Sequence, residues 1–102
     1  MDKIKVVSNR QRVELYVNKI LYIERRDRKI ELVCKNHTYP VNDSLENLSH
    51  ILPESYVRCH TGYIVNLENV SAIHSKYILM DNGVIIPVGR AYKNNLEKLI
   101  VV

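Results

Sequence analysis

The apolar residues of this chain occur in short runs of about five residues at most, and turn-forming residues separate each run from the next. Runs of this length are typical of β-strands, whereas a helix needs a longer periodic pattern. Residues 12–17 alternate polar and apolar side chains strictly, as a strand with one buried face does. Asn82 and Gly83 favour a two-residue hairpin turn, because both tolerate positive φ angles. The pattern predicts a mostly β protein.

The other strand-like segments follow the same pattern of short apolar runs bounded by polar residues. Residues 30–34 place Ile30, Leu32 and Cys34 on one face of a strand. Pro87 lies inside the run at residues 84–88, which predicts an edge strand or a strand end at that point. The remaining predicted strands are residues 4–7, 20–23, 38–41, 56–59, 63–66, 70–74 and 76–80.

One internal helix interrupts the β pattern. Leu45, Leu48 and Leu52 recur at helical spacing and form one apolar stripe. Asp43 or Ser44 can cap this helix, because a short side chain with an oxygen atom accepts from the free amides of the first turn. Pro53 ends it, since proline disfavours helical geometry at the residue before it.

A short C-terminal helix is predicted over residues 91–100. Its apolar positions would face the body of the protein at Tyr92, Leu96, Leu99 and Ile100.

Length and composition limit the class of protein. The chain has 102 residues, so we expect one compact domain over residues 1–102. No apolar run is long enough for a membrane-spanning helix, and no signal-peptide pattern follows Met1. We therefore expect a cytoplasmic protein with no membrane partner. In a reducing compartment, Cys34 and Cys59 are expected to be buried or half-buried thiols rather than a disulfide.

The positive charge of the chain is concentrated at one place. The formal net charge is +4, and four cations lie within five positions, interrupted only by Asp27. An acidic partner such as nucleic acid is one explanation, and a solvated hairpin turn that protects a strand edge is the other. We favour the first, because the cluster lies between two predicted strands and would project several cations from one tip. Its members are Arg25, Arg26, Arg28 and Lys29.

Motifs for catalysis and for metal binding are absent from the sequence. Its three glycines are too far apart for a phosphate-binding loop. Cys34 with His37, and Cys59 with His60, lack the paired spacing of a structural zinc site. We therefore expect no enzyme activity, no cofactor and no metal. A small metal-dependent nuclease using Asp27 with either Glu14 or Glu24 remains an alternative, although that spacing is unspecific.

Five motifs occur together in a characteristic order. The chain reads Ile-Leu-Tyr-Ile-Glu at residues 20–24 and Ser-Leu at the predicted helix start. It continues with Arg-x-His-x-x-Tyr-Ile-Val-Asn at residues 58–66, then Asn-Gly, and then Pro-Val-x-Arg-x-Tyr at residues 87–92. With these motifs, nearly the whole chain resembles a LytTR-type DNA-binding domain of bacterial transcription regulators.

That resemblance implies both a fold and a mode of binding. It implies an elongated arrangement of short antiparallel sheets with little helix. It also implies that loops, and not a recognition helix, enter the major groove of double-stranded DNA. The target sites would be direct repeats, each occupied by one domain. The function implied is sequence-specific DNA binding for transcription regulation, without catalysis.

Three DNA-contact regions of the family match positions in this chain. The segment after Glu24 places Arg25, Arg26, Arg28 and Lys29 near the duplex, where they are expected to hold phosphates. Thr61 matches a second contact region, where the family often has a longer side chain. Arg90 is expected to read a base, because its guanidinium can donate to both O6 and N7 of guanine. A salt bridge or a helix cap is the alternative role for Arg90.

Three other motif residues have roles that are open or mainly structural. His60 and Asn66 are expected to hold the turn through hydrogen bonds to backbone, with DNA contact as a second interpretation for His60. Arg58 either binds phosphate or holds an acidic partner, and the sequence leaves both open. Gly89 stands where the family commonly has serine, which predicts a looser loop or a closer approach of the backbone to DNA.

The partners follow from the same resemblance. Family domains normally follow a receiver or another sensor module, which is absent from this chain. We therefore expect either an excised domain or a free-standing regulator, which could meet a second copy as a dimer on DNA. The alternatives are an RNA- or single-strand-binding module that uses the same basic cluster, and a protein-interaction domain.

Overall fold

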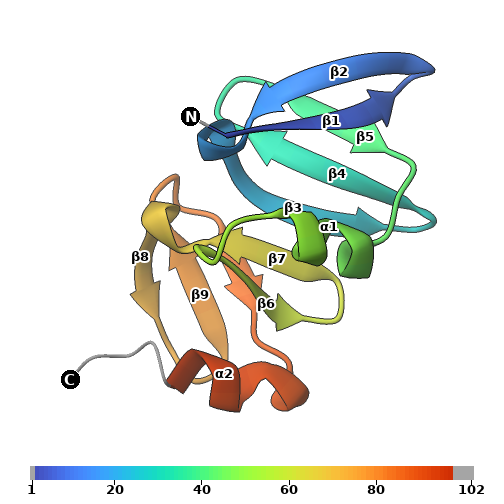
Figure 1. Cartoon of the computed structure of the whole chain (residues 1–102). Helices are drawn as coiled ribbons and strands as arrows, with labels where there is room; N and C mark the ends of the chain where they lie inside the picture. The colour runs from blue at the N-terminus through green and yellow to red at the C-terminus, as the bar shows by residue number, and fades with distance from the viewer. Residues whose placement is uncertain (1, 98–102) are drawn as a thin grey trace.

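The computed structural model describes residues 2–97, which fold into three antiparallel sheets and two short α-helices (Figure 1). The strands are β1 (Lys3–Ser8), β2 (Gln11–Tyr16), β3 (Ile20–Arg26), β4 (Lys29–Cys34), β5 (Thr38–Val41), β6 (Tyr56–His60), β7 (Tyr63–Asn66), β8 (Val70–Ile73), β9 (Tyr77–Met80) and β10 (Ile85–Pro87). The helices are α1 (Leu45–Ile51) and α2 (Lys93–Glu97), and three 3-10 turns are η1 (Val17–Lys19), η2 (Leu67–Asn69) and η3 (Arg90–Tyr92). The predicted mostly β fold with one internal helix is confirmed.

A five-stranded sheet forms the centre of the molecule, with the strand order β5-β4-β3-β7-β6. The β1–β2 hairpin and α1 cover one face of it, and the sheet β10-β9-β8 lies with α2 on the other side (Figure 1). These layers give the described part of the chain an elongated shape of 43 × 28 × 24 Å. The expected elongated arrangement of short sheets is therefore present.

Each face of the central sheet has its own hydrophobic core. Ile23, Leu32 and Ile64 pack with the β1–β2 hairpin and α1, whereas Tyr22 and Val65 pack toward the three-stranded sheet. Neighbouring residues of β3 and β7 thus belong to opposite cores, as the alternation of side chains along a strand requires. Burial on both faces explains why these strands are apolar along most of their length.

The strand β4 shows the predicted facing of its apolar residues. Ile30, Leu32 and Cys34 all pack in the core beneath the β1–β2 hairpin, and Val33 packs on the other side. Cys34 is half-buried and Cys59 is fully buried, and both are free thiols. The expectation of two unpaired thiols is confirmed.

The helix α1 begins and ends where the sequence predicts. The Ser44 hydroxyl accepts from the backbone amide of Asn47 at 3.0 Å, and the helix ends just before Leu52 and Pro53. Leu45 and Leu48 are fully buried, so the apolar stripe is the packing face. No helix within residues 2–97 has the length and apolar character needed to cross a bilayer.

Two predictions near the C-terminus need correction. A two-residue turn was predicted at Asn82 and Gly83, but the structure has a three-residue loop that also includes Asp81. Met80 and Val84 still pair across it, and within this loop only Gly83 has a positive φ, of 88°. Three-residue hairpin loops of this kind end in a left-handed residue, which favours glycine. Pro87 ends the edge strand β10, as predicted.

The C-terminal helix is the second correction. It begins at Lys93, after the 3-10 turn η3, whereas residues 91–100 were predicted as one helix. Leu96 is buried and Tyr92 is half-buried against the body, while Leu99 and Ile100 lie outside the described residues.

A buried polar cluster joins the starts of β3 and β6 to the end of β7. The Asn66 side chain is 1% exposed, and its amide nitrogen donates to the Ile20 carbonyl at 3.2 Å and to the Tyr56 hydroxyl at 3.1 Å. Its oxygen accepts from the Glu68 amide at 3.1 Å. The Tyr56 hydroxyl in turn donates to the Val17 carbonyl and lies 3.0 Å from that of Ile20. Each polar atom therefore has a partner despite its burial.

We expect Asn66→Ala to lower the free energy of unfolding by about 2–3 kcal/mol, because it leaves buried polar partners without a hydrogen bond. Asn69→Ala is the matched control, since that side chain lies in the same segment and makes none of these bonds. Its effect should stay within about 0.5 kcal/mol. Urea denaturation of both variants measures the difference, and equal losses would contradict a special role for Asn66.

The buried Cys59 thiol predicts a pH dependence of stability. Burial raises the pKa of Cys59 from 9.0 to about 12. Between these values the unfolded thiol loses its proton while the folded thiol keeps it, so stability falls as pH rises. From pH 8 to pH 10, wild type should lose about 1–2 kcal/mol more than Cys59→Ala, because the variant lacks this ionisation. The measurement is urea denaturation at both pH values, and parallel losses would contradict the prediction.

Candidate nucleic-acid interface

Three turns meet at one end of the central sheet. Because the sheet is antiparallel, the turn after β3 and the turn after β6 lie at the same end. The Arg25 amide donates to the Gly62 carbonyl at 2.8 Å, which joins the first two turns. The Gly89 amide donates to the Cys59 carbonyl at 2.8 Å, which brings Arg90 to the same place. The three contact regions predicted from separate parts of the sequence are thus adjacent. We call this region the contact end.

The basic segment at residues 25–29 is a tight hairpin and not a loop of four free cations. Arg25 and Arg26 belong to β3, Lys29 begins β4, and only Asp27 and Arg28 form the turn. Side chains alternate along a strand, so Arg25 and Arg26 point to opposite faces of the sheet. Of the cations predicted at the tip, Arg28 lies in the turn itself and the other three lie on the two strands beside it. The cations thus surround the end of the hairpin.

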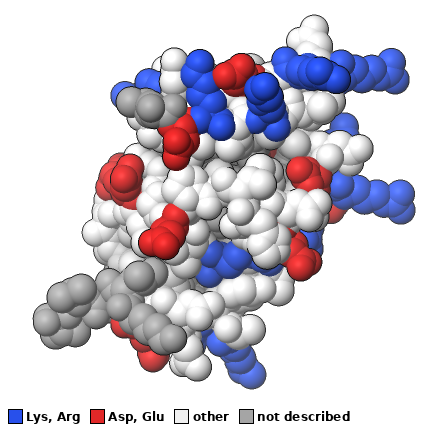
Figure 2. Space-filling view, in the orientation of Figure 1, with Lys and Arg blue, Asp and Glu red and all other residues white. Residues whose placement is uncertain are grey.

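The cations at the contact end form no ion pair within the described part of the chain. Within residues 2–97 the one ion pair joins Lys3 and Glu14 at 3.5 Å, on β1 and β2. Arg26 lies directly opposite Lys29 across the hairpin, and like charges in this position are unfavourable for pairing. Figure 2 shows cationic side chains projecting from the right-hand margin, where the hairpins β1–β2 and β3–β4 end. This arrangement is suited to an anionic partner.

The β6–β7 turn is held by His60, as predicted. The Gly62 amide donates to the His60 Nδ1 atom at 3.0 Å, and the His60 ring lies edge-on to Tyr63. The Tyr63 hydroxyl donates to the Glu24 carboxylate at 3.0 Å, which ties the turn to β3. Burial, followed by the adjacent Glu24, raises the pKa of Tyr63, so this donor keeps its proton. Thr61 is left exposed at the apex.

Arg58 lies beneath this turn and contacts no carboxylate among the described residues. Its guanidinium donates to the Thr61 carbonyl at 3.0 Å and to the His60 carbonyl at 3.4 Å. The same group lies 3.4 Å from the Tyr92 hydroxyl and 5.5 Å from the centre of the Tyr92 ring. Arg58 therefore connects the β6–β7 turn to η3. The sequence suggested that Arg58 binds a phosphate or an acidic partner. The structure instead shows an internal bridging role.

Gly89 is held by a backbone hydrogen bond and has an ordinary extended backbone conformation. Its φ is −79°, and the hydrogen bond from its amide to the Cys59 carbonyl fixes the segment against β6. A Cβ atom at this position would lie 3.3 Å from the Tyr92 ring and 3.6 Å from His60. A side chain here would thus point into the contact between η3 and the β6–β7 turn. Of the two effects expected from Gly89, a looser loop finds no support in the described structure, and a closer approach of the backbone to DNA stays a prediction.

Arg90 is the first residue of η3 and is exposed. Within residues 2–97 its side chain makes no ion pair, and η3 has no side-chain cap at its start. The alternative roles of salt bridge and helix cap therefore find no support in the described structure. Arg90 projects from a backbone segment held by hydrogen bonds, and its donors have no partner among the described residues.

The carboxylates considered for a metal-dependent nuclease have other roles or lie in different sheets. Glu24 accepts from Tyr63, and Glu14 pairs with Lys3 in the β1–β2 sheet, whereas Asp27 lies in the β3–β4 turn of the central sheet. Within the described residues, no three His, Cys, Asp or Glu side chains form a group that could hold a metal ion.

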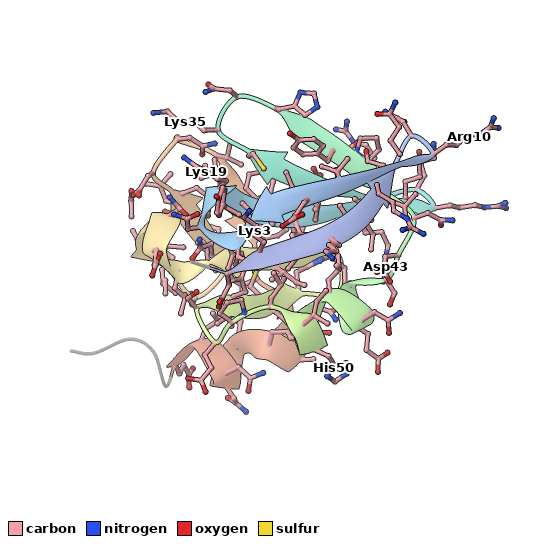
Figure 3. The ribbon with its side chains drawn as sticks, turned by 45° about the horizontal axis from the view of Figure 1, so that its top comes forward. Lys3, Arg10, Lys19, Lys35, Asp43 and His50 are labelled. Carbon is pink, nitrogen blue, oxygen red and sulfur yellow. The ribbon has the colours of Figure 1, made fainter. Side chains whose placement is uncertain are left out.

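Sequence reasoning missed one cation at this end. Arg10 lies at the tip of the β1–β2 hairpin, and it lines a shallow hollow together with Arg28 and Lys29. Residues 8–11 were interpreted only as a polar connection. The signal was present, because a two-residue turn between two alternating strands must expose its second residue. Figure 3 shows Arg10 extending away from the body, at the end opposite Lys3, Lys19 and Lys35.

These features define a class of protein: an antiparallel β-domain that presents unpaired cations from hairpin turns at one end. Comparison with known proteins identifies the family. Residues 10–101 match the LytTr DNA-binding domain family model. The chain therefore belongs to the LytTR family, which comprises DNA-binding domains and not enzymes. DNA binding for transcription regulation is the function that this membership supports.

Individual relatives agree with the family assignment. The chain is 33% identical over 87 residues to sensory transduction protein LytT of Bacillus subtilis, covering 79% of this chain and 36% of that protein. It is 29% identical over 106 residues to the protein of the same name from Bacillus cereus, covering 98% of this chain and 43% of that protein. The chain thus spans less than half the length of these relatives.

A solved structure has the same fold over the whole chain. It is described as the LytTr DNA-binding domain of a methyl-accepting/DNA response regulator from Bacillus cereus. The TM-score is 0.85 at 27% sequence identity, and the match covers 100% of this chain and 99% of that one.

We expect Arg58→Lys to loosen the contact end, because a lysine ammonium cannot bridge two carbonyls and also stack on Tyr92. Amide hydrogen exchange at Gly62 and Tyr92 should become faster. Exchange at Ile64, within the sheet, should change little. Arg25→Lys is the matched control, since the Arg25 side chain makes no hydrogen bond within the described residues. Unchanged exchange in Arg58→Lys would show that the bridge does not fix the turn.

Proposed function

We propose that this chain binds double-stranded DNA sequence-specifically to regulate transcription, by inserting the turns of the contact end into the major groove of direct-repeat sites. The observation that carries the proposal is the meeting of three turns at one end of the central sheet, two of which present exposed arginines, Arg28 and Arg90. Membership of the LytTR family supports the same conclusion.

The spacing of the turns suits a DNA groove. Adjacent strands in a sheet lie about 4.8 Å apart. In the order β4-β3-β7-β6, the midpoints of the two hairpins are two strand spacings apart, or about 10 Å. The major groove is about 12 Å wide and admits a two-stranded ribbon. One turn can therefore enter the groove while its neighbour follows the phosphate backbone beside it.

Each cation has a role that follows from its setting. Arg90 projects from a backbone segment held by the bonds of Gly89 and Arg58, and its guanidinium can read guanine through O6 and N7. Arg25, Arg26, Arg28 and Lys29 surround the β3–β4 turn and are suited to phosphates, which set register without reading sequence. Thr61, at the apex of its turn, is short enough to contact a thymine methyl group.

The wider setting is part of the same proposal. Because the chain spans less than half the length of its sensory transduction relatives, the domain would be controlled by a receiver or sensor module. Such a regulator would act in the bacterial cytoplasm, and neighbouring copies would meet as dimers on repeated sites. Among the tyrosines near the contact end, Tyr22 is buried and Tyr63 and Tyr92 are engaged internally, so nothing favours base stacking with single strands.

Selection from a random double-stranded DNA library at physiological salt tests the proposal. Wild type should enrich a direct repeat. Arg90→Lys should keep its charge and much of its nonspecific affinity, but should relax the preference at one position by roughly 1–3 kcal/mol, because lysine lacks the two-pronged donor. Lys93→Arg, on the neighbouring helix, is the control and should retain the wild-type motif.

The outcomes separate the hypotheses. A motif that is equally sharp in Arg90→Lys would remove Arg90 from base reading. The absence of any enriched motif in wild type would contradict sequence-specific binding. Stronger binding to single strands or RNA in a parallel competition would favour the alternative nucleic-acid module.

A further inference from the structure

We propose that the tip of the β1–β2 hairpin is a second anion-binding element, in which Arg10 acts with Arg28 to hold a phosphate of the DNA backbone. This inference rests on the proposed function and extends its footprint beyond the three turns of the contact end. It concerns a segment that begins just before the part of the chain matched by the family model, residues 10–101.

The tips of the β1–β2 and β3–β4 hairpins lie side by side, although the two hairpins belong to different sheets. The β1–β2 hairpin packs across one face of the central sheet, with β1 beside β5. As a result, Asn9 and Arg10 line the same hollow as Arg28 and Lys29. Figure 1 shows both hairpins ending on the same side of the molecule.

The lining of this hollow is suited to an anion. Three cations and two asparagines contribute to it, and none of its lining residues is a carboxylate. Arg10, Arg28 and Lys29 are exposed, and none of them makes an ion pair within residues 2–97. A phosphate placed here would meet donors from two separate hairpins. The lining residues are Val7, Asn9, Arg10, Arg28, Lys29, Pro40, Val41 and Asn42.

The backbone of the tip supplies an independent argument. Ser8 pairs with Gln11, so Asn9 and Arg10 are the two central residues of the turn. Their φ angles are 50° and 65°, and positive values at both positions define a type I′ turn. Asn-Gly is the favoured pair for this turn, because glycine adopts a positive φ without strain. This chain has arginine in the position that favours glycine.

Folding does not account for that arginine. Its side chain is exposed and makes no hydrogen bond or ion pair within the described residues, so it offsets none of the backbone strain. Residues held in an unfavourable backbone conformation are common at functional sites. Arg10 lines one hollow with Arg28 and Lys29, which points to a role for its charge, and a site with three cations is suited to a phosphate.

The test measures DNA affinity as a function of salt for the whole chain and its variants. The probe is the duplex selected by wild type or, if selection yields none, a mixed-sequence duplex. Each phosphate contact contributes about 0.9 to the slope of log affinity against log salt. Arg10→Gly should make the slope shallower by about this amount and weaken binding roughly five- to tenfold at low salt, while raising the melting temperature. The selected sequence motif should not change.

Two further variants separate charge from backbone effects. Arg10→Lys should retain the wild-type slope, because it keeps the cation. Arg12→Gln removes an exposed arginine of the same hairpin that does not line the hollow, and should have little effect on the slope. The rise in melting temperature expected for Arg10→Gly ensures that weaker binding cannot be attributed to unfolding.

The outcomes are distinct. If wild type binds with a steep salt dependence and Arg10→Gly matches it, the inference is overturned while the proposed function stands. An equal loss of slope in Arg12→Gln would also overturn it, since general charge would then explain the effect. If wild type shows no salt-dependent binding to any duplex, the proposed function fails, and the hairpin site fails with it.

Discussion

Burial of both faces of the central sheet is the constraint on which the rest of the structure depends. The β1–β2 hairpin and α1 cover one face, and the three-stranded sheet and α2 cover the other. A sheet covered in this way can present polar chemistry only at the ends of its strands. Antiparallel pairing then brings the turns after β3 and β6 to the same end, and the hydrogen bond from the Gly89 amide to the Cys59 carbonyl adds the segment of Arg90. The cations are therefore gathered by topology and not by attraction to one another.

The two ends of the sheet are stabilised in different ways. At one end, Asn66 and Tyr56 form a buried polar cluster in which each donor and acceptor is matched. At the contact end, His60 and Arg58 use their side chains to hold the backbone of the turn, so that Thr61 and Arg90 remain free. Local features there, such as Arg26 opposite Lys29, are unfavourable for folding alone. Cooperative packing of the two cores offsets them, which leaves the tips available for binding.

Much of the fold could be predicted because local patterns and tertiary packing agree. The leucine stripe of α1, its Ser44 cap and the one-sided facing of Ile30 are local consequences of periodicity. The errors occurred where a local pattern permits several geometries. Asn82 and Gly83 fit turns of two or three residues, and the pairing of Met80 with Val84 selects three. The role of Arg58 could not be predicted, because its partner Tyr92 is 34 positions away in the sequence.

The sequence by itself determined the strand pattern, the internal helix and the types of side chain at each turn, since these depend on periodicity and on local backbone preference. Its motifs also pointed to the LytTR family, which comparison confirmed. Only the tertiary structure decided which turns share a surface. Strand order joins the β3–β4 and β6–β7 turns, and packing of the β1–β2 hairpin across the sheet brings Arg10 beside Arg28. That arrangement arises from contacts between residues distant in sequence, and no pattern within a single segment encodes it.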